Sequence, residues 1–371
     1  PQVLPRVEVQ KVTVPGAPEP SRPNRFPFLM LLTPLIMGAA LYAITQNLMS
    51  MVFIALSPLM MIGTWLDNRI QARKMHRESV ENYGATLGLI REELEEYRRA
   101  DIEARHAQYP PIDKIAAGAM RREGVLWSRR PEHPEFLSVR LGIGTDDAAI
   151  AFETGEMSKG IPDCIKLARQ LCEEFETVDN VPMVVNLRQV GGLGLCGPRQ
   201  WLQEVQAAVT VQIASLYSPA EVVIACLTSG ARLESWEWLE WLPHTSSPHT
   251  PLAANHLASD SATGNELLSA LEGVLEDRQK SRESGGPKIE RGPIFDSTKA
   301  ERPGGEVPAI VVIVDDVTVD QARLNRLAEL GPDAGIHVVW SAETLGEIPA
   351  AWNHLHDIFR FIEIGTAVQQ Q

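Results

Sequence analysis

The chain has 371 residues, of which 44% are hydrophobic and 22% are charged, and its formal net charge is −14. This length exceeds that of one simple domain, so we expect two or three structural units. An acidic chain repels phosphate backbones, which argues against bulk nucleic-acid binding, and we expect no nucleic-acid partner.

An uncharged run over residues 26–66 contains no Lys, Arg, Asp or Glu. One membrane span needs about 20 apolar residues, so the run predicts two transmembrane helices, at about Phe26–Ile44 and Leu48–Trp65. Basic residues flank the run on both sides, and the turn inside it is uncharged. This pattern predicts a multi-pass protein of the plasma (inner) membrane, in contact with lipid, with both termini cytoplasmic. A buried hydrophobic hairpin in a soluble protein is the alternative.

A charged segment at residues 67–129 follows, after a first segment at 1–25 and the apolar run at 26–66. It predicts a long helical stalk to about Gln108 and a second helix at about Ile112–Glu123. Its apolar residues recur in a 3-4 spacing that is typical of a coiled-coil seam. We interpret the seam as a surface that binds partner helices; the alternative is an amphipathic helix covering its own domain. The seam consists of Val80, Tyr83, Leu87, Ile90, Leu94 and Tyr97.

Short apolar segments alternate with helical patterns through residues 130–371. Continuous apolar runs, such as Glu221–Leu227 and Pro308–Asp316, predict buried strands. Alternation of this kind predicts an α/β domain with a mainly parallel sheet, covered by helices on both faces, as in P-loop NTPases. Residues 281–305 are rich in Gly, Pro, Ser and charge and predict a long surface loop.

The stretch VGGLGLCGPRQ, residues 190–200, is similar to a phosphate-binding loop that lacks its lysine. Gly192 and Gly197 have the GxxxxG spacing, but Pro198 and Arg199 stand where the motif has Lys and Ser or Thr. Proline has no N–H to donate, and the guanidinium of Arg199 can contact a phosphate but cannot ligate Mg²⁺.

The apolar run that ends in Asp315 and Asp316 has the form of a Walker B strand, whose acids hold Mg²⁺. Together with Gly192, Gly197 and Arg199, these acids form the candidate nucleotide site, which we predict to be degenerate and to contain no catalytic residue. Residual binding of a nucleotide or anion, and a loop that only packs, both stay open. We expect no cofactor in this segment.

Three tryptophans, Trp236, Trp238 and Trp241, lie within one short segment. The sequence leaves open whether they form core or a contact surface. His244 and His249 follow, but no third ligand has a fitting spacing, and the four cysteines form no CxxC pair. We therefore expect no metal site.

Two segments, LWSRRPEHPEFLSVRLGIGT (126–145) and WEWLEWLPH (236–244), carry a resemblance to a known family. With the two predicted spans, the stalk, the degenerate loop and SPAEVVIACL (218–227), in this order, they resemble the N-terminal part of EccC, the FtsK/SpoIIIE-type ATPase of mycobacterial type VII secretion systems. The resemblance covers essentially the whole chain. It implies two transmembrane helices, a stalk and a degenerate ATPase-like domain, followed in the parent protein by domains that use ATP and Mg²⁺.

The resemblance implies the membrane anchor and coupling portion of a secretion motor, itself inactive, that links the cytosolic ATPase domains to the membrane channel. It further implies assembly with EccB, EccD and EccE, six copies around a pore, and secreted protein substrates that engage domains absent here. The alternatives are the membrane segment of an FtsK-class DNA translocase, a self-sufficient membrane ATPase and a purely structural scaffold. The net charge argues against the first, and the missing lysine against the second. The chain starts at Pro1 rather than Met, which suggests a fragment.

Overall fold

The computed structural model describes residues 9–20, 36–37, 48–283, 308–316, 319–344, 346–347, 355–361 and 368–369. These residues form two compact units, and each unit is built from separate stretches of the chain. What we call the stalk unit takes its described residues from Val7–Asp101 and Asp147–Val178. The sheet unit takes its described residues from Ile102–Asp146 and Asp179–Gln371.

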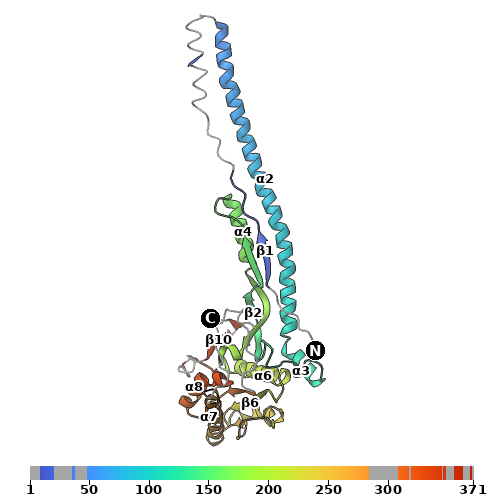
Figure 1. The fold of residues 1–371 in the computed structure, drawn as a ribbon, viewed down its shortest axis with the longest axis vertical. Helices are drawn as coiled ribbons and strands as arrows, with labels where there is room; N and C mark the ends of the chain where they lie inside the picture. The colour runs from blue at the N-terminus through green and yellow to red at the C-terminus, as the bar shows by residue number, and fades with distance from the viewer. Residues whose placement is uncertain are drawn as a thin grey trace. The chain divides into compact units, whose positions relative to one another are not determined.

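The stalk unit contains most of the 61-residue helix α2 (Leu48–Gln108), beside a parallel pair of strands (Figure 1). The strands are β1 (Gln10–Val14) and β3 (Ile150–Thr154). A second helix, α4 (Pro162–Glu174), starts with a proline, whose missing N–H costs nothing in the first turn. The buried Cys164, Ala168 and Leu171 of α4 face the core of this unit.

The predicted seam of α2 is covered by its own unit. Tyr83, Leu87 and Leu94 are 7%, 6% and 0% exposed, and they pack in one core with Val12 and Val14 of β1 and the apolar face of α4. The hydroxyl of Tyr83 also donates to the carbonyl oxygen of Pro15 at 2.8 Å. Val80, Ile90 and Tyr97 lie half-buried against the same core. This is the arrangement of a helix that covers its own domain; binding of partner helices by the seam stays a prediction.

No helix among the described residues is both long enough and apolar enough to cross a membrane. The predicted transmembrane hairpin over residues 26–66, and the multi-pass localisation drawn from it, are therefore wrong. The span predicted at Leu48–Trp65 is instead the first part of α2, which continues without a break into the charged sequence that starts at Asp67. The span predicted at Phe26–Ile44 lies outside the described residues, apart from two helical residues at 36–37.

The sheet unit is built on a seven-stranded sheet with the order β11-β10-β5-β9-β8-β6-β7. All neighbours are parallel except β10 and β11, which confirms the predicted mainly parallel sheet. The strands are β5 (Leu193–Cys196), β6 (Val222–Leu227), β7 (Leu257–Ala258), β8 (Ala309–Val314), β9 (Ile336–Ala342), β10 (His356–Phe361) and β11 (Val368–Gln369).

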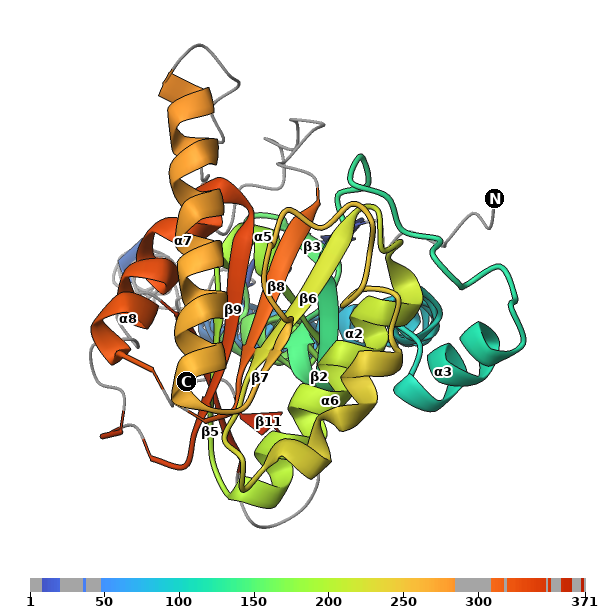
Figure 2. The same cartoon turned by 90° about the horizontal axis from the view of Figure 1, so that it is seen from below.

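Helices cover both faces of this sheet (Figure 2). Helix α6 (Arg199–Leu216) packs on one face, and α7 (Ser261–Glu283) and α8 (Gln321–Leu330) pack on the other. In β8, Val311 and Ile313 belong to the core on the α6 side, while their neighbours in the chain belong to the core on the α7 and α8 side. A strand buried on both faces needs an apolar residue at every position, which explains the continuous apolar run.

The remaining elements are two strands of 10 residues each, β2 and β4, and several short helices. The predicted second helix is α3, and the strands β2 and β4 pair with each other. The loop predicted at 281–305 begins inside α7, and its residues from 284 onward lie outside the described residues. The bounds are α3 (Ile112–Met120), β2 (Ser138–Asp147), β4 (Thr177–Asn186), α5 (Leu187–Val190), η1 (Leu233–Ser235), η2 (Glu237–Trp241) and η3 (Gly331–Ala334).

Tyr217, directly after α6, is buried in the core of the sheet unit. Its hydroxyl donates to the carbonyl oxygen of Ser138 at 3.1 Å, and its ring meets Phe136 edge-on with 5.2 Å between the centroids. Burial is the main cause that raises the pKa of Tyr217 from 10.0 to about 12.

We expect Tyr217→Phe to reduce the loss of folding stability that occurs at alkaline pH. Because the pKa of Tyr217 is higher in the folded than in the unfolded protein, its protonated hydroxyl contributes to stability, and this contribution is complete below about pH 10. The contribution disappears as the pH rises toward 12. By about pH 11 the loss amounts to roughly 1.4 kcal/mol. Denaturant unfolding at about pH 8 and about pH 11 should show this smaller loss in the phenylalanine variant. Parallel losses in both proteins would contradict the assignment.

Candidate functional site

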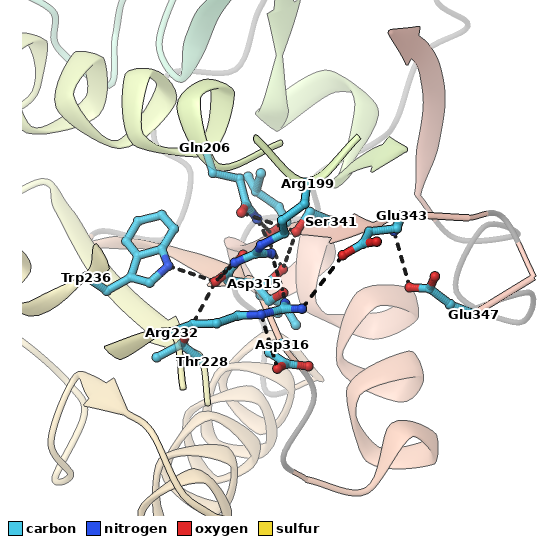
Figure 3. Close-up of polar contacts among 12 residues, drawn as sticks. Arg199, Gln206, Thr228, Arg232, Trp236, Asp315, Asp316, Ser341, Glu343 and Glu347 are labelled. Atoms are coloured by element: carbon cyan, nitrogen blue, oxygen red, sulfur yellow. Dashed lines mark hydrogen bonds and ion pairs between the residues drawn. The ribbon is translucent and has the colours of Figure 1, made fainter. Parts of the chain in front are cut away.

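The carboxyl ends of β5, β6, β8 and β9 meet at one edge of the sheet, because these strands are parallel. In open α/β sheets this edge is where ligands bind. The segments that follow the strands bring together Arg199, Thr228, Arg232, Asp315 and Glu343 (Figure 3).

Asp315, the first residue after β8, is only 2% exposed and forms an ion pair with Arg199. The two nitrogens Nη1 and Nη2 of Arg199 donate to Oδ1 and Oδ2 of Asp315 at 2.5 Å and 2.7 Å. This two-pronged geometry is the strongest form of an arginine–carboxylate contact. Arg199 is the first residue of α6, so the start of that helix is tied to the end of β8.

Further donors surround the same carboxylate. The indole nitrogen of Trp236 donates to Oδ2 of Asp315 at 3.0 Å, and the hydroxyl of Thr228 does so at 3.3 Å. Arg232 donates through Nη1 to the backbone oxygen of Asp315 at 2.7 Å. A buried carboxylate is tolerated only when its charge is compensated and its oxygens are hydrogen-bonded, and both conditions are met here.

The outer part of the site is more open to solvent. Nε of Arg232 lies 3.4 Å from a carboxylate oxygen of Asp316, and its Nη2 lies 4.0 Å from one of Glu343. The side chains of Asp316 and Glu343 are 38% and 52% exposed. Such exposed pairs contribute little to stability, so the buried pair of Arg199 and Asp315 dominates the energetics of the site.

A second buried polar contact, next to the ion pair, joins α6 to β8 and β9. The side-chain amide of Gln206 donates to the backbone oxygen of Val314 at 3.1 Å. The hydroxyl of Ser341, in β9, donates to the side-chain oxygen of Gln206 at 3.2 Å (Figure 3). Sequence reasoning missed Gln206 and Ser341, because a single polar residue inside an apolar pattern carries no signal. Thr228 could have been predicted, since it directly follows a predicted strand.

The structure separates the two glycines of the candidate loop. Gly192 lies before β5, whereas Gly197 lies after it. A Cβ atom on Gly192 would come within 3.0 Å of the carbonyl oxygen of Val338 and within 2.8 Å of Leu355, so close packing explains this glycine. The strand itself fills the interval of the GxxxxG spacing, and only Gly197 and Pro198 connect β5 to α6.

The residues at this edge do not fit a magnesium nucleotide. A phosphate loop cradles its ligand with several backbone N–H groups. Here Gly197 donates its N–H to the carbonyl oxygen of Ala342 at 3.3 Å, and Pro198 has none. The carboxylate of Asp315 that would hold Mg²⁺ is occupied by the guanidinium of Arg199. Gly197, Arg199, Asp315 and Asp316 are therefore brought to one edge, but they form an internal ion-pair network.

The other candidate residues do not converge on a site. Trp236 is 1% exposed and stacks on Trp238 with 6.1 Å between the ring centroids, whereas Trp241 is 88% exposed. The cluster is thus divided between core and surface. His244 is buried against the backbone oxygen of Tyr217, and His249 is exposed. Within the described ranges, no three His, Cys, Asp or Glu side chains are grouped to hold a metal ion.

Comparison with known proteins links the chain to one kind of secretion protein. No family model matches it. It is 25% identical over 349 residues to the ESX secretion system protein EccC of Geobacillus thermodenitrificans, covering 90% of this chain and 22% of that protein. It is 26% identical over 289 residues to the EccC protein of Thermomonospora curvata, covering 75% of this chain and 22% of that protein.

A solved structure of the cytoplasmic domain of the Thermomonospora curvata type VII secretion ATPase EccC matches with a TM-score of 0.37 and 17% identity. The match covers 64% of this chain and 25% of the solved one. The sequence comparison is what shows homology to EccC proteins over most of the chain. The chain spans 22% of the length of each of these curated relatives.

Proposed function

We propose that this chain, a homologue of the ESX secretion system proteins EccC, is a coupling part of a type VII secretion motor that does not itself hydrolyse nucleotide. It would transmit movement from ATP-hydrolysing domains of a longer parent protein to other parts of the secretion machinery. ATP and Mg²⁺ would act in those domains, and this chain would need no cofactor. Assembly with EccB, EccD and EccE in six copies, and engagement of secreted proteins by the parent, complete the proposal.

The ion pair of Arg199 and Asp315 is the observation that carries the proposal. In a working P-loop ATPase, the nucleotide and its magnesium ion bridge the strand ends, and the bridge is lost when the ligand leaves. In this chain, side chains from the segments after β5, β6 and β8 make the bridge themselves. A sheet edge that side chains already close, without a ligand, suits a domain that transmits movement rather than a domain whose conformation changes as nucleotide binds and leaves.

We expect the intact chain to bind neither Mg-ATP nor Mg-ADP at concentrations up to about 1 mM. For each nucleotide this means a dissociation constant above about 1 mM, which is weak binding. Isothermal titration calorimetry measures this directly. The matched control is Asp316→Asn, which removes an acid from the exposed side of the site and leaves the buried pair intact. A saturable heat in the wild type that this variant abolishes would contradict the proposal and identify a nucleotide sensor.

A further inference from the structure

Strand β3 of the stalk unit has a free edge. Within the part of the chain that the structure describes, it pairs only with β1. The pairing is parallel, and the N–H of Gly155 donates to the carbonyl oxygen of Val14 at 2.9 Å. Successive residues of a strand direct their backbone groups to opposite sides. The N–H and C=O groups of Ile150, Phe152 and Thr154 therefore face away from β1.

A groove of about 480 Å³ lies between this strand and α4. The half-buried Ile150, Phe152 and Cys172 give it an apolar floor. The residues contributed by α4 recur at the spacing of one helix face. All of the lining residues belong to the stalk unit, so a single compact body forms the groove. The lining consists of Asp147, Ala148, Ile150, Phe152, Arg169, Cys172, Glu173 and Glu176.

The charge around the groove is negative. Asp147, Glu173 and Glu176 are exposed at its rim and outnumber the single guanidinium of Arg169. A lysine or arginine side chain suits such a site, because its aliphatic stem covers apolar floor while its charged end meets carboxylates. Charge complementarity of this kind selects the partner and speeds the encounter with it.

We propose that the groove binds an extended, basic segment of a partner protein, which pairs with the free edge of β3 as an added strand. Main-chain hydrogen bonds to Ile150, Phe152 and Thr154 would supply affinity, as in other proteins that bind peptides by strand addition. One lysine or arginine of the segment would lie over Phe152 and direct its charge toward Glu173 and Glu176. The proposal goes beyond the coupling function and does not depend on the site around Asp315.

Cys172 provides a reporter inside the groove. It is the only one of the four cysteines that is not buried, so a maleimide should modify it first. The intact chain is alkylated with and without the probe peptide acetyl-Thr-Val-Arg-Val-Thr-amide. The matched peptide has glutamate in place of arginine. At about 5 mM we expect the arginine peptide to slow alkylation about threefold or more, which corresponds to millimolar affinity, and the glutamate peptide to have no effect.

The double variant Glu173→Gln/Glu176→Gln tests the recognition of charge, and it should abolish protection by the arginine peptide. Rates are compared with and without peptide within each protein, because Glu173 itself helps to raise the pKa of the Cys172 thiol. Equal protection by both peptides, or protection that survives in the double variant, would overturn the proposal. So would a Cys172 that resists alkylation without any peptide, since another part of this chain or a second copy would then fill the groove.

Discussion

Replacing Arg199 with alanine should lower the free energy of unfolding of the sheet unit by about 3 kcal/mol. The change leaves the carboxylate of Asp315, whose side chain is 0% exposed, without a compensating cation. Breaking a buried ion pair from one side costs roughly 3–5 kcal/mol. We expect the lower end of this range, because the side chain of Arg199 is itself 26% exposed and water can take part of its place.

Denaturant unfolding followed by tryptophan fluorescence measures this loss, since Trp236 donates directly to Asp315. The control is Arg121→Ala, which removes a contact of 3.4 Å to Glu123 between side chains that are 72% and 54% exposed. It should cost less than about 1 kcal/mol. The double variant Arg199→Ala/Asp315→Asn removes both charges and should recover a large part of the loss. Equal losses of unfolding free energy for the two arginine variants would show that the buried ion pair contributes no more to stability than an exposed one.

Leu94→Ala should destabilise the stalk unit by about 3 kcal/mol, within the usual range of about 2–5 kcal/mol for a fully buried leucine. Leu94 is 0% exposed and packs against β1 and α4. Leu89, in the same helix, is 69% exposed, so Leu89→Ala should change stability by less than about 0.5 kcal/mol. Thermal unfolding followed by circular dichroism compares the two variants.

This pair of variants also separates the two interpretations of the α2 seam. If the seam served only to bind partner helices, its loss would weaken assembly and leave the isolated chain as stable as before. In the structure the seam is core, so the isolated chain should already unfold more easily. No difference between the variants at positions 94 and 89 would show that the seam does not stabilise its own unit.

Strands buried on both faces could be predicted from the sequence, because their pattern is unambiguous. The run at Ala309–Val314 is apolar at every position, and both of its faces are in the core. The acids that follow it could also be placed at the sheet edge, since parallel strands end together there. The partner of Asp315 could not, because nothing in the sequence says that the side chain of Arg199 turns toward β8.

The prediction of two membrane spans failed because it counted apolar residues without knowing where an element begins. The uncharged run at residues 26–66 was counted as two spans, but its second half begins a helix that continues into charged sequence. Strand β5 lies between Gly192 and Gly197, so their GxxxxG spacing alone does not define a phosphate-binding loop. Neither apolarity nor spacing reports the boundary of an element.

The connection between β5 and α6 also matters for how such chains are compared and engineered. It consists of Gly197 and Pro198 alone, whereas a phosphate cradle needs a longer stretch of backbone. Placing lysine and threonine at positions 198 and 199 would supply the side chains of the motif, but it would not lengthen the backbone between the strand and the helix. The difference from a nucleotide-binding loop therefore lies in the length of backbone between the strand and the helix, as well as in the side chains at positions 198 and 199.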